Sequence, residues 1–327
     1  MTKALENLQA KAAIWVDQMA GMMALADRLG HPRPDLSVYQ RQIFDLYSQE
    51  LELSKLMDSS DLVIHADGPA IEDHKAALGV VAHLFSNVER QFKRLALSVL
   101  DLGVADRKVA ASKLDFRLTG IAPGSLYAGF CIEPPKASEL LGTAEETQMM
   151  ADVKAATLSV TAVPKSVTDK GQLAEELGQW VGDPVVRDSA LLAAYHLSPT
   201  GRSGIVSIDF INPAEDQVAP STLDASHRQL LREVTQKNPL IKSRTRHGSF
   251  VGNLTSIDLD KSRVDLRGIG AEGFDSIRCI LPALTAQKGR EILGHRVRIS
   301  GLYETTPSGR PSLLQVEQIE VVGQMNI

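Results

Sequence analysis

The most regular pattern of apolar and polar positions lies in residues 250–322. Apolar and polar residues alternate there with a period of two, which is typical of strands whose two faces meet different surroundings. Alternation predicts that Val264, Leu266, Val297 and Ile299 point inward. The predicted elements are strands at Phe250–Asp258, Arg263–Arg267 and Ser276–Leu281, a helix at Leu284–Leu293, and strands at His295–Tyr303 and Ser312–Val322.

Helical periodicity governs the N-terminal end of the chain. Apolar residues recur at helical spacing over about residues 4–29, and Gly30 with the two prolines at 32 and 34 ends that helix. A second helix over about residues 36–57 has a broad apolar face. We expect these two helices to form a hairpin over residues 1–60.

A longer helix is expected to begin at Asp67-Gly68-Pro69 and to run to about Asp101, with a heptad-like seam of apolar residues. Such a seam is either the core face of a helix packed on a sheet or the contact face of a homodimer or partner coiled coil. Both alternatives bury the same side chains, so the sequence leaves them open. The seam consists of Leu78, Val81, Phe85, Val88, Phe92, Leu95 and Val99.

Shorter elements fill the middle of the chain. Residues 61–66 and 204–211 are predicted strands, and residues 114–121 and 125–132 form a hairpin around Pro123-Gly124, a pair typical of a type II turn. Helices are expected at about 143–160, 171–181, 183–197 and 222–234, followed by a linker at 238–247.

The predicted fold is α+β, with an N-terminal helical hairpin (1–60), a body of long helices on a small mixed sheet (61–241), and a C-terminal barrel (242–327). The order β-β-β-α-β-β resembles that of an OB-fold over residues 248–323. That superfold more often grips an oligonucleotide or a protein than performs chemistry, although a shared superfold does not determine function.

Composition narrows the class of protein. The 327 residues are 43% hydrophobic and 23% charged, without an apolar stretch long enough to span a bilayer, so we expect a cytoplasmic protein with no membrane contact. Cys131 and Cys279 are the only cysteines, which argues against a disulfide framework. Residues 242–327 carry 12 Lys and Arg against 9 Asp and Glu, whereas the whole chain has a net charge of −5. The barrel is therefore basic and the remainder acidic.

Basic side chains of the barrel are the main candidates for binding. Alternation places Arg263, Arg267, Arg296 and Arg298 opposite the apolar residues, on a solvent face that would suit a nucleic-acid backbone or another anion. The alternative is a solvated exterior whose arginines pair with Asp258, Asp265 and Glu304. The remaining candidates are Lys242, Arg244 and Arg246 before the first strand, Arg310 in the last turn, and Phe250, Phe274 and Tyr303 for stacking on bases.

Candidate chemistry is sparse. His65, Asp67, Asp73 and His74 form a dense group of ligand-type side chains, but carboxylates also suit the start of a helix. Ser125 lacks a Gly-x-Ser-x-Gly elbow and a histidine nearby in the sequence, so a hydrolase is not expected. We predict no cofactor and no metal.

The leading hypothesis is a non-enzymatic, bacterial-type assembly or adaptor subunit that oligomerises or binds a protein, DNA or RNA through its barrel. One alternative is an accessory or antitoxin-like component of a defence or toxin system. The other is a metal-dependent enzyme that uses the His65–His74 region.

Overall fold

The computed structural model divides the chain into two compact units. Unit 1 comprises residues 1–83, 115–133 and 201–222, and unit 2 comprises residues 84–114, 134–200 and 223–327. The structure describes residues 3–71, 76–99, 114–122, 125–133, 144–167, 175–215, 221–237, 240–241, 244–271, 274–282 and 285–324.

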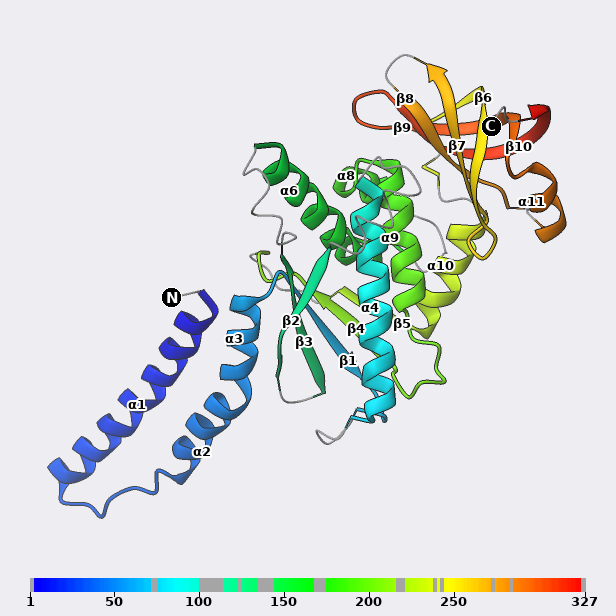
Figure 1. The fold of residues 1–327 in the computed structure, drawn as a ribbon. Helices are drawn as coiled ribbons and strands as arrows, with labels where there is room; N and C mark the ends of the chain where they lie inside the picture. The colour runs from blue at the N-terminus through cyan, green and yellow to red at the C-terminus, as the bar shows by residue number, and fades with distance from the viewer. Residues whose placement is uncertain are drawn as a thin grey trace. The chain divides into compact units, whose positions relative to one another are not determined.

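The N-terminal hairpin of unit 1 is present. Helix α1 (Lys3–Leu29) runs beside α2 (Ser37–Asp45), a π-helical turn (Leu46–Glu50) and α3 (Leu51–Ser59) (Figure 1). Buried Leu8, Ala12 and Leu46 join the two arms. Gly30 ends α1 with φ of 65°, a left-handed conformation that costs a residue without Cβ little.

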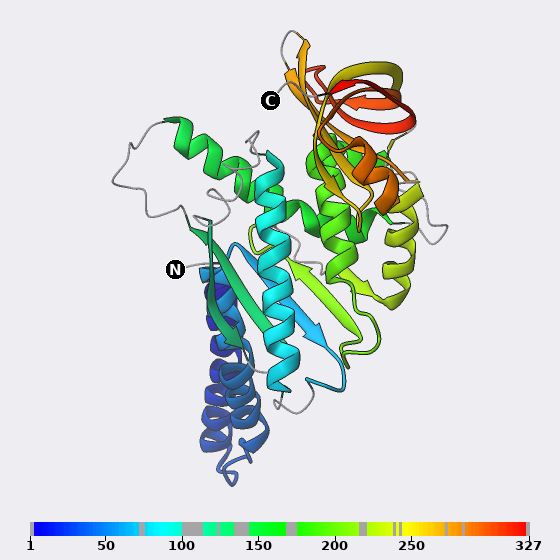
Figure 2. The same cartoon turned by 45° about the vertical axis from the view of Figure 1, so that its right-hand side comes forward.

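The sheet of unit 1 has the strand order β2-β3-β1-β4-β5. Its pairings of β2 with β3, β3 with β1 and β1 with β4 are antiparallel (Figure 2). Strand β5 was not predicted. One face packs Val63, Ala122 and Ile211 against Leu56 of α3. The strands are β1 (Leu62–Asp67), β2 (Asp115–Ala122), β3 (Leu126–Glu133), β4 (Ser207–Ile211) and β5 (Ser221–Asp224).

The seam helix, α4 (Leu78–Val99), begins later than expected. Asp67-Gly68-Pro69 does not start it, because Asp67 is the last residue of β1 and residues 68–71 form a turn. Val88, Phe92 and Leu95 are buried, whereas Leu78 is 83% exposed. The buried face is completed by Leu84, Gln91 and Ala96, so the expected seam is core at its centre and open at its start.

The other helices of unit 2 are short. Asp183 caps α9 by accepting hydrogen bonds from the backbone N–H groups of Val185 (2.7 Å) and Val186 (3.2 Å), and Pro184 occupies the first turn. The helices are α6 (Ala144–Leu158), a 3-10 turn (Ser159–Thr161), α7 (Ala162–Ser166), α8 (Glu175–Trp180), α9 (Pro184–Leu197) and α10 (Ala225–Lys237).

The C-terminal strands form a closed barrel in the order β10-β8-β7-β6-β9, with β10 parallel to β8 and every other neighbour antiparallel. The expected element order and the inward positions of Val264, Leu266, Val297 and Ile299 are confirmed, since each of these side chains is at most 1% exposed. The elements are β6 (Thr245–Asp258), β7 (Arg263–Ala271), β8 (Phe274–Ile280), α11 (Ala286–Ile292), β9 (His295–Thr305) and β10 (Pro311–Gln324).

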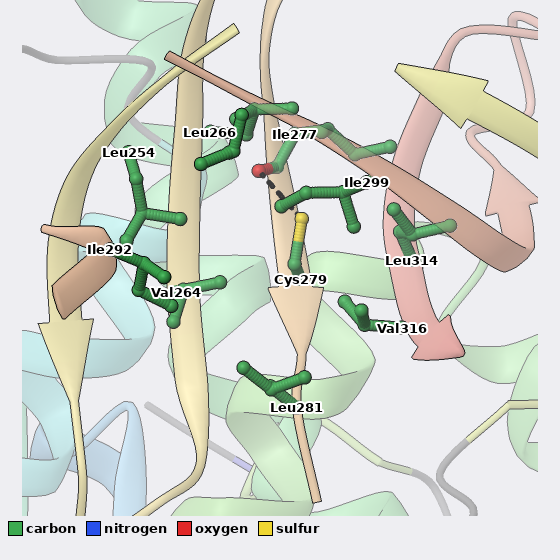
Figure 3. Close-up of a cluster of buried hydrophobic side chains, with 11 residues drawn as sticks. Leu254, Val264, Leu266, Ile277, Cys279, Leu281, Ile292, Ile299, Leu314 and Val316 are labelled. Carbon is green, nitrogen blue, oxygen red and sulfur yellow. Dashed lines mark hydrogen bonds between the residues drawn. The ribbon is translucent and has the colours of Figure 1, made fainter. Parts of the chain in front are cut away.

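Figure 3 shows the apolar side chains that fill the barrel, with Cys279 among them. Its thiol donates to the carbonyl oxygen of Ile277 (3.7 Å), and burial raises the pKa of the Cys279 thiol. Cys279 is therefore a core residue, whereas Cys131 is only partly buried. No helix among the described residues combines the length and apolarity needed to cross a bilayer.

Candidate functional site

Arg263, predicted on the solvent face, is instead 6% exposed and bound to Asp188 of α9. Its Nε and Nη2 donate to the two carboxylate oxygens at 3.1 and 2.6 Å, and Nη2 also donates to the carbonyl oxygen of Thr235 (3.0 Å). Arg278 lies 3.6 Å from the same carboxylate. Burial alone would raise the pKa of Asp188, but the arginines outweigh it and hold the pKa below its usual value.

Glu304, expected as a surface partner for the barrel arginines, is also buried. It forms an ion pair with Arg187, the neighbour of Asp188, and its Oε1 accepts a hydrogen bond from the backbone N–H of Ile241 (2.6 Å). Two consecutive residues of α9 thus neutralise charges on β7 and β9. The prediction that alternation alone would send these charges to solvent was wrong, because α9 covers that part of the barrel.

The other predicted basic residues do not form one continuous face. Arg296 and Arg298 are exposed on the outside of β9, and Nη1 of Arg298 lies 3.7 Å from Glu320. Arg246 is exposed. It lies four residues before Phe250 on β6, so its side chain leaves the strand on the same face as Phe250, which packs against the barrel core. The cross-strand neighbour of Arg246 is Tyr303, whereas Arg298 faces Val251. Five residues of strand, about 17 Å, separate these two positions.

Arg244 directly precedes β6, and its Nη1 donates to the carbonyl oxygen of Gly178 (3.0 Å). Arg267 and Arg310 are each partly buried, and Lys242 lies outside the described residues. The aromatic candidates contact each other: the Phe250 ring packs edge-on against Phe274 and Tyr303, with centroids 6.0 and 5.4 Å apart. Their half-buried rings support the barrel core.

A groove borders the outer edge of β10. Strand β8 pairs with β10 only at Leu313–Gln315, so residues 316–324 have no strand partner on that edge among the described residues. The groove beside it has a volume of about 520 Å³. It is lined by Leu281, Pro282, Lys288, Val316, Glu317, Gln318, Ile319 and Glu320.

A different polar group lies on the sheet of unit 1. The strand register places His65 of β1 between Tyr127 of β3 and Asp209 of β4, so all three side chains share one face. Ser125 lies in the turn directly before β3, and its hydroxyl reaches His65 on the same face. Three segments that are distant in sequence therefore meet at His65.

Hydrogen bonds connect this group into a chain. The Nδ1 of His65 lies 2.7 Å from Oδ2 of Asp209, and the Nε2 of His65 contacts the Oγ of Ser125 within hydrogen-bond distance. The Tyr127 ring stacks on the imidazole, with centroids 4.0 Å apart and planes 11° from parallel. The side chains of His65 and Asp209 are 16% and 15% exposed, so the group is sheltered but reachable.

No histidine lies near Ser125 in the sequence, but the fold brings His65 to its hydroxyl. The hydroxyl and the imidazole are 60 residues apart in sequence, and the carboxylate is a further 84 residues beyond Ser125, so no local motif could signal them. The available signal was polar His65 and Asp209 at alternating positions of otherwise apolar strands. Sequence alone could not tell which strands were neighbours.

A metal site at His65, Asp67, Asp73 and His74 was only an alternative in the sequence analysis, and the structure describes just the first two of these residues. Among the residues that it describes, no group of three or more His, Cys, Asp or Glu side chains is arranged to hold a metal ion. Asp73 and His74 lie outside the described residues. His65 binds Asp209 and Ser125 through its two ring nitrogens, which leaves neither nitrogen free for a metal in this arrangement.

Comparisons with protein-family models, with curated proteins and with solved structures found no match to this chain.

Proposed function

We propose that the protein is an adaptor or assembly subunit whose C-terminal barrel, of the OB type, binds an extended segment of a protein partner along β10. The observation that carries the proposal is the edge of residues 316–324, which no described strand covers. Backbone N–H and C=O groups on such an edge pair readily with an added strand. The five strands and the helix between the third and fourth agree with an OB-type barrel.

The side chains beside this edge favour a particular partner. Ile319, which is partly buried, and the outer atoms of the core residues Leu281 and Val316 line the groove and suit apolar side chains at alternate positions of an extended peptide. Glu317 and Glu320 are 50% and 63% exposed, with His247 3.1 Å from Glu317 and Arg298 3.7 Å from Glu320; both contacts are exposed, so each carboxylate can also face a basic residue on the partner. The expected occupant is thus a strand-forming segment with alternating apolar residues and at least one Lys or Arg.

Charge argues against nucleic acid as the ligand of this groove. A nucleic-acid backbone needs several unneutralised cations, since each phosphate contact releases a counterion. Asp188 pairs with Arg263 and lies 3.6 Å from Arg278, and Glu320 lies 3.7 Å from Arg298, so these cations are partly compensated within the protein. DNA or RNA binding is therefore the competing outcome of the experiment.

The test is selection of peptides from a random display library on the intact protein. Selected peptides should alternate apolar and basic residues and should slow amide hydrogen exchange in residues 316–324. The double variant Glu317→Lys/Glu320→Lys should weaken binding about tenfold, equivalent to about 1.4 kcal/mol. Glu176→Lys, at an exposed position of α8, is the matched charge reversal and should leave the affinity unchanged.

Protection of a different segment by the selected peptides would overturn the proposal. Salt-sensitive oligonucleotide binding that strengthens in Glu317→Lys/Glu320→Lys would replace the protein partner with a nucleic acid.

A further inference from the structure

We propose that Ser125 is a nucleophile, activated by His65 and Asp209, that accepts an acyl group from an uncharged carboxylic ester. This site lies in unit 1 and is independent of the barrel groove. The inference rests on the chain of contacts from the Asp209 carboxylate on β4, through the His65 imidazole on β1, to the hydroxyl of Ser125 in the turn before β3.

The order of contacts determines where the protons lie. An ionised Asp209 can only accept a hydrogen bond, so the Nδ1 of His65 carries the hydrogen and donates it. The Nε2 of the same ring is then an unprotonated acceptor, directed at the Ser125 hydroxyl. This is the arrangement in which an imidazole removes a hydroxyl proton while the oxygen attacks a carbonyl carbon.

The reaction balances without a cofactor. As the Oγ of Ser125 bonds to the carbonyl carbon, its proton passes to Nε2 of His65, and the ester C–O bond then breaks. The departing alkoxide takes that proton and leaves as an alcohol, while Ser125 remains as an acyl ester. Water hydrolyses this ester in the same way and releases a carboxylic acid.

The surroundings hold the imidazole in one orientation. Tyr127 stacks on one ring face, and Asp209 fixes the Nδ1 edge. Both His65 and Asp209 are mostly buried, which strengthens their hydrogen bond relative to one in water. A general base that is already oriented avoids the cost of ordering it during the reaction.

Negative charge on this face selects the substrate class. Asp67 follows His65 by two residues and lies on the same face of β1. Burial, together with the charges of Asp209 and Asp67, raises the pKa of Tyr127, so the phenol is neutral at physiological pH. The two carboxylates would repel an anionic phosphoester, and the neutral Tyr127 adds no positive charge to offset them. An uncharged acyl ester meets no such repulsion.

The test uses a fluorophosphonate probe, which is uncharged and forms a covalent bond with activated serine hydroxyls. Intact protein should gain one probe by mass spectrometry, with the label on the peptide that contains Ser125. Ser125→Ala should abolish labelling, and His65→Gln should slow it by about 100-fold or more, the range of general-base contributions. The protein should release nitrophenol from p-nitrophenyl acetate but not from p-nitrophenyl phosphate.

Ser60→Ala is the matched control. The Ser60 hydroxyl is also partly buried in unit 1, but its partners are Thr119 (2.6 Å) and the carbonyl oxygen of Leu56 (2.6 Å). This variant should label at the rate of the unaltered protein. Circular dichroism verifies that each variant is folded.

Absence of labelling in the unaltered protein would overturn the proposal, because a hydrogen-bond chain that only joins strands has no need of a reactive hydroxyl. Labelling that persists in Ser125→Ala, or whose rate is unchanged in folded His65→Gln, would also overturn it.

Discussion

Arg187 and Asp188 carry opposite charges into the interior at consecutive positions of α9. Both are at most 1% exposed, and each has a partner on the barrel, Glu304 for Arg187 and Arg263 for Asp188. Removing two ions from water is costly, so such pairs need good geometry and additional hydrogen bonds. The Ile241 N–H supplies one of these bonds to Glu304. Two ion pairs of opposite polarity thus join α9 to the barrel.

Arg187→Met should lower the free energy of unfolding by about 3–5 kcal/mol, because Glu304 would stay buried without its cation. Urea denaturation followed by circular dichroism measures the loss. Arg298→Ala is the control, because its contact with Glu320 is exposed, and it should cost at most about 1 kcal/mol.

The double variant Arg187→Met/Glu304→Gln should recover part of that loss. It removes both charges and keeps a side-chain oxygen for the Ile241 N–H. A single-variant cost below about 1 kcal/mol would show that the pair contributes little to folding.

At the scale of elements, α4 shows how a regular apolar pattern can be only partly buried. Phe92 and Leu95 are fully buried, whereas Leu78 at the start of the helix is largely exposed. Gln91, directly before Phe92 in the sequence, is buried as well, and its Nε2 donates to Oδ1 of Asn87 (3.1 Å). A buried amide with a partner is tolerated in a core. Heptad spacing identified the buried face but not its ends.

Phe92→Ala should destabilise the protein by about 3–5 kcal/mol, since it removes a fully buried aromatic side chain and leaves a cavity. Leu78→Ala on the same helix should change stability by no more than about 0.5 kcal/mol, because Leu78 is already in water. Thermal or urea unfolding of the two variants provides the comparison. Equal effects would mean that a partner molecule covers Leu78 in solution.

At the scale of the whole molecule, the barrel belongs to a larger compact unit. Unit 2 combines residues 223–327 with α9 and its neighbouring helices. Asp188 on α9 binds arginines from both β7 and β8. The barrel is therefore expected to unfold cooperatively with α9. Unit 1 is expected to unfold separately.

Asp188→Asn tests this coupling, since it keeps the shape of the side chain and removes its charge. Amide hydrogen exchange should quicken about tenfold or more in both α9 and β7, because a hydrogen bond to a charged group contributes about 1.5–3 kcal/mol. Exchange in β1 of unit 1 should be unchanged. Faster exchange confined to α9 would indicate that the barrel folds independently.

Local patterns in the sequence were sufficient for most elements. Alternation identified the inward residues of the barrel, such as Val264 and Ile299, because side chains of a strand necessarily alternate between its faces. Gly30 marked the end of α1 through its own backbone conformation. These features depend on residues within one or two turns of the chain, so they can be read in order.

Only the tertiary structure decided what each face meets. Arg263 has the outward parity expected, yet α9, 75 residues earlier in the chain, covers it and supplies Asp188. His65 and Asp209 are 144 residues apart and become neighbours because β1 pairs with β4. Alternation of apolar and polar residues tells on which face of a strand a side chain lies. The identity of its neighbour depends on which distant segment packs there, and that is determined by burial and charge pairing across the whole fold.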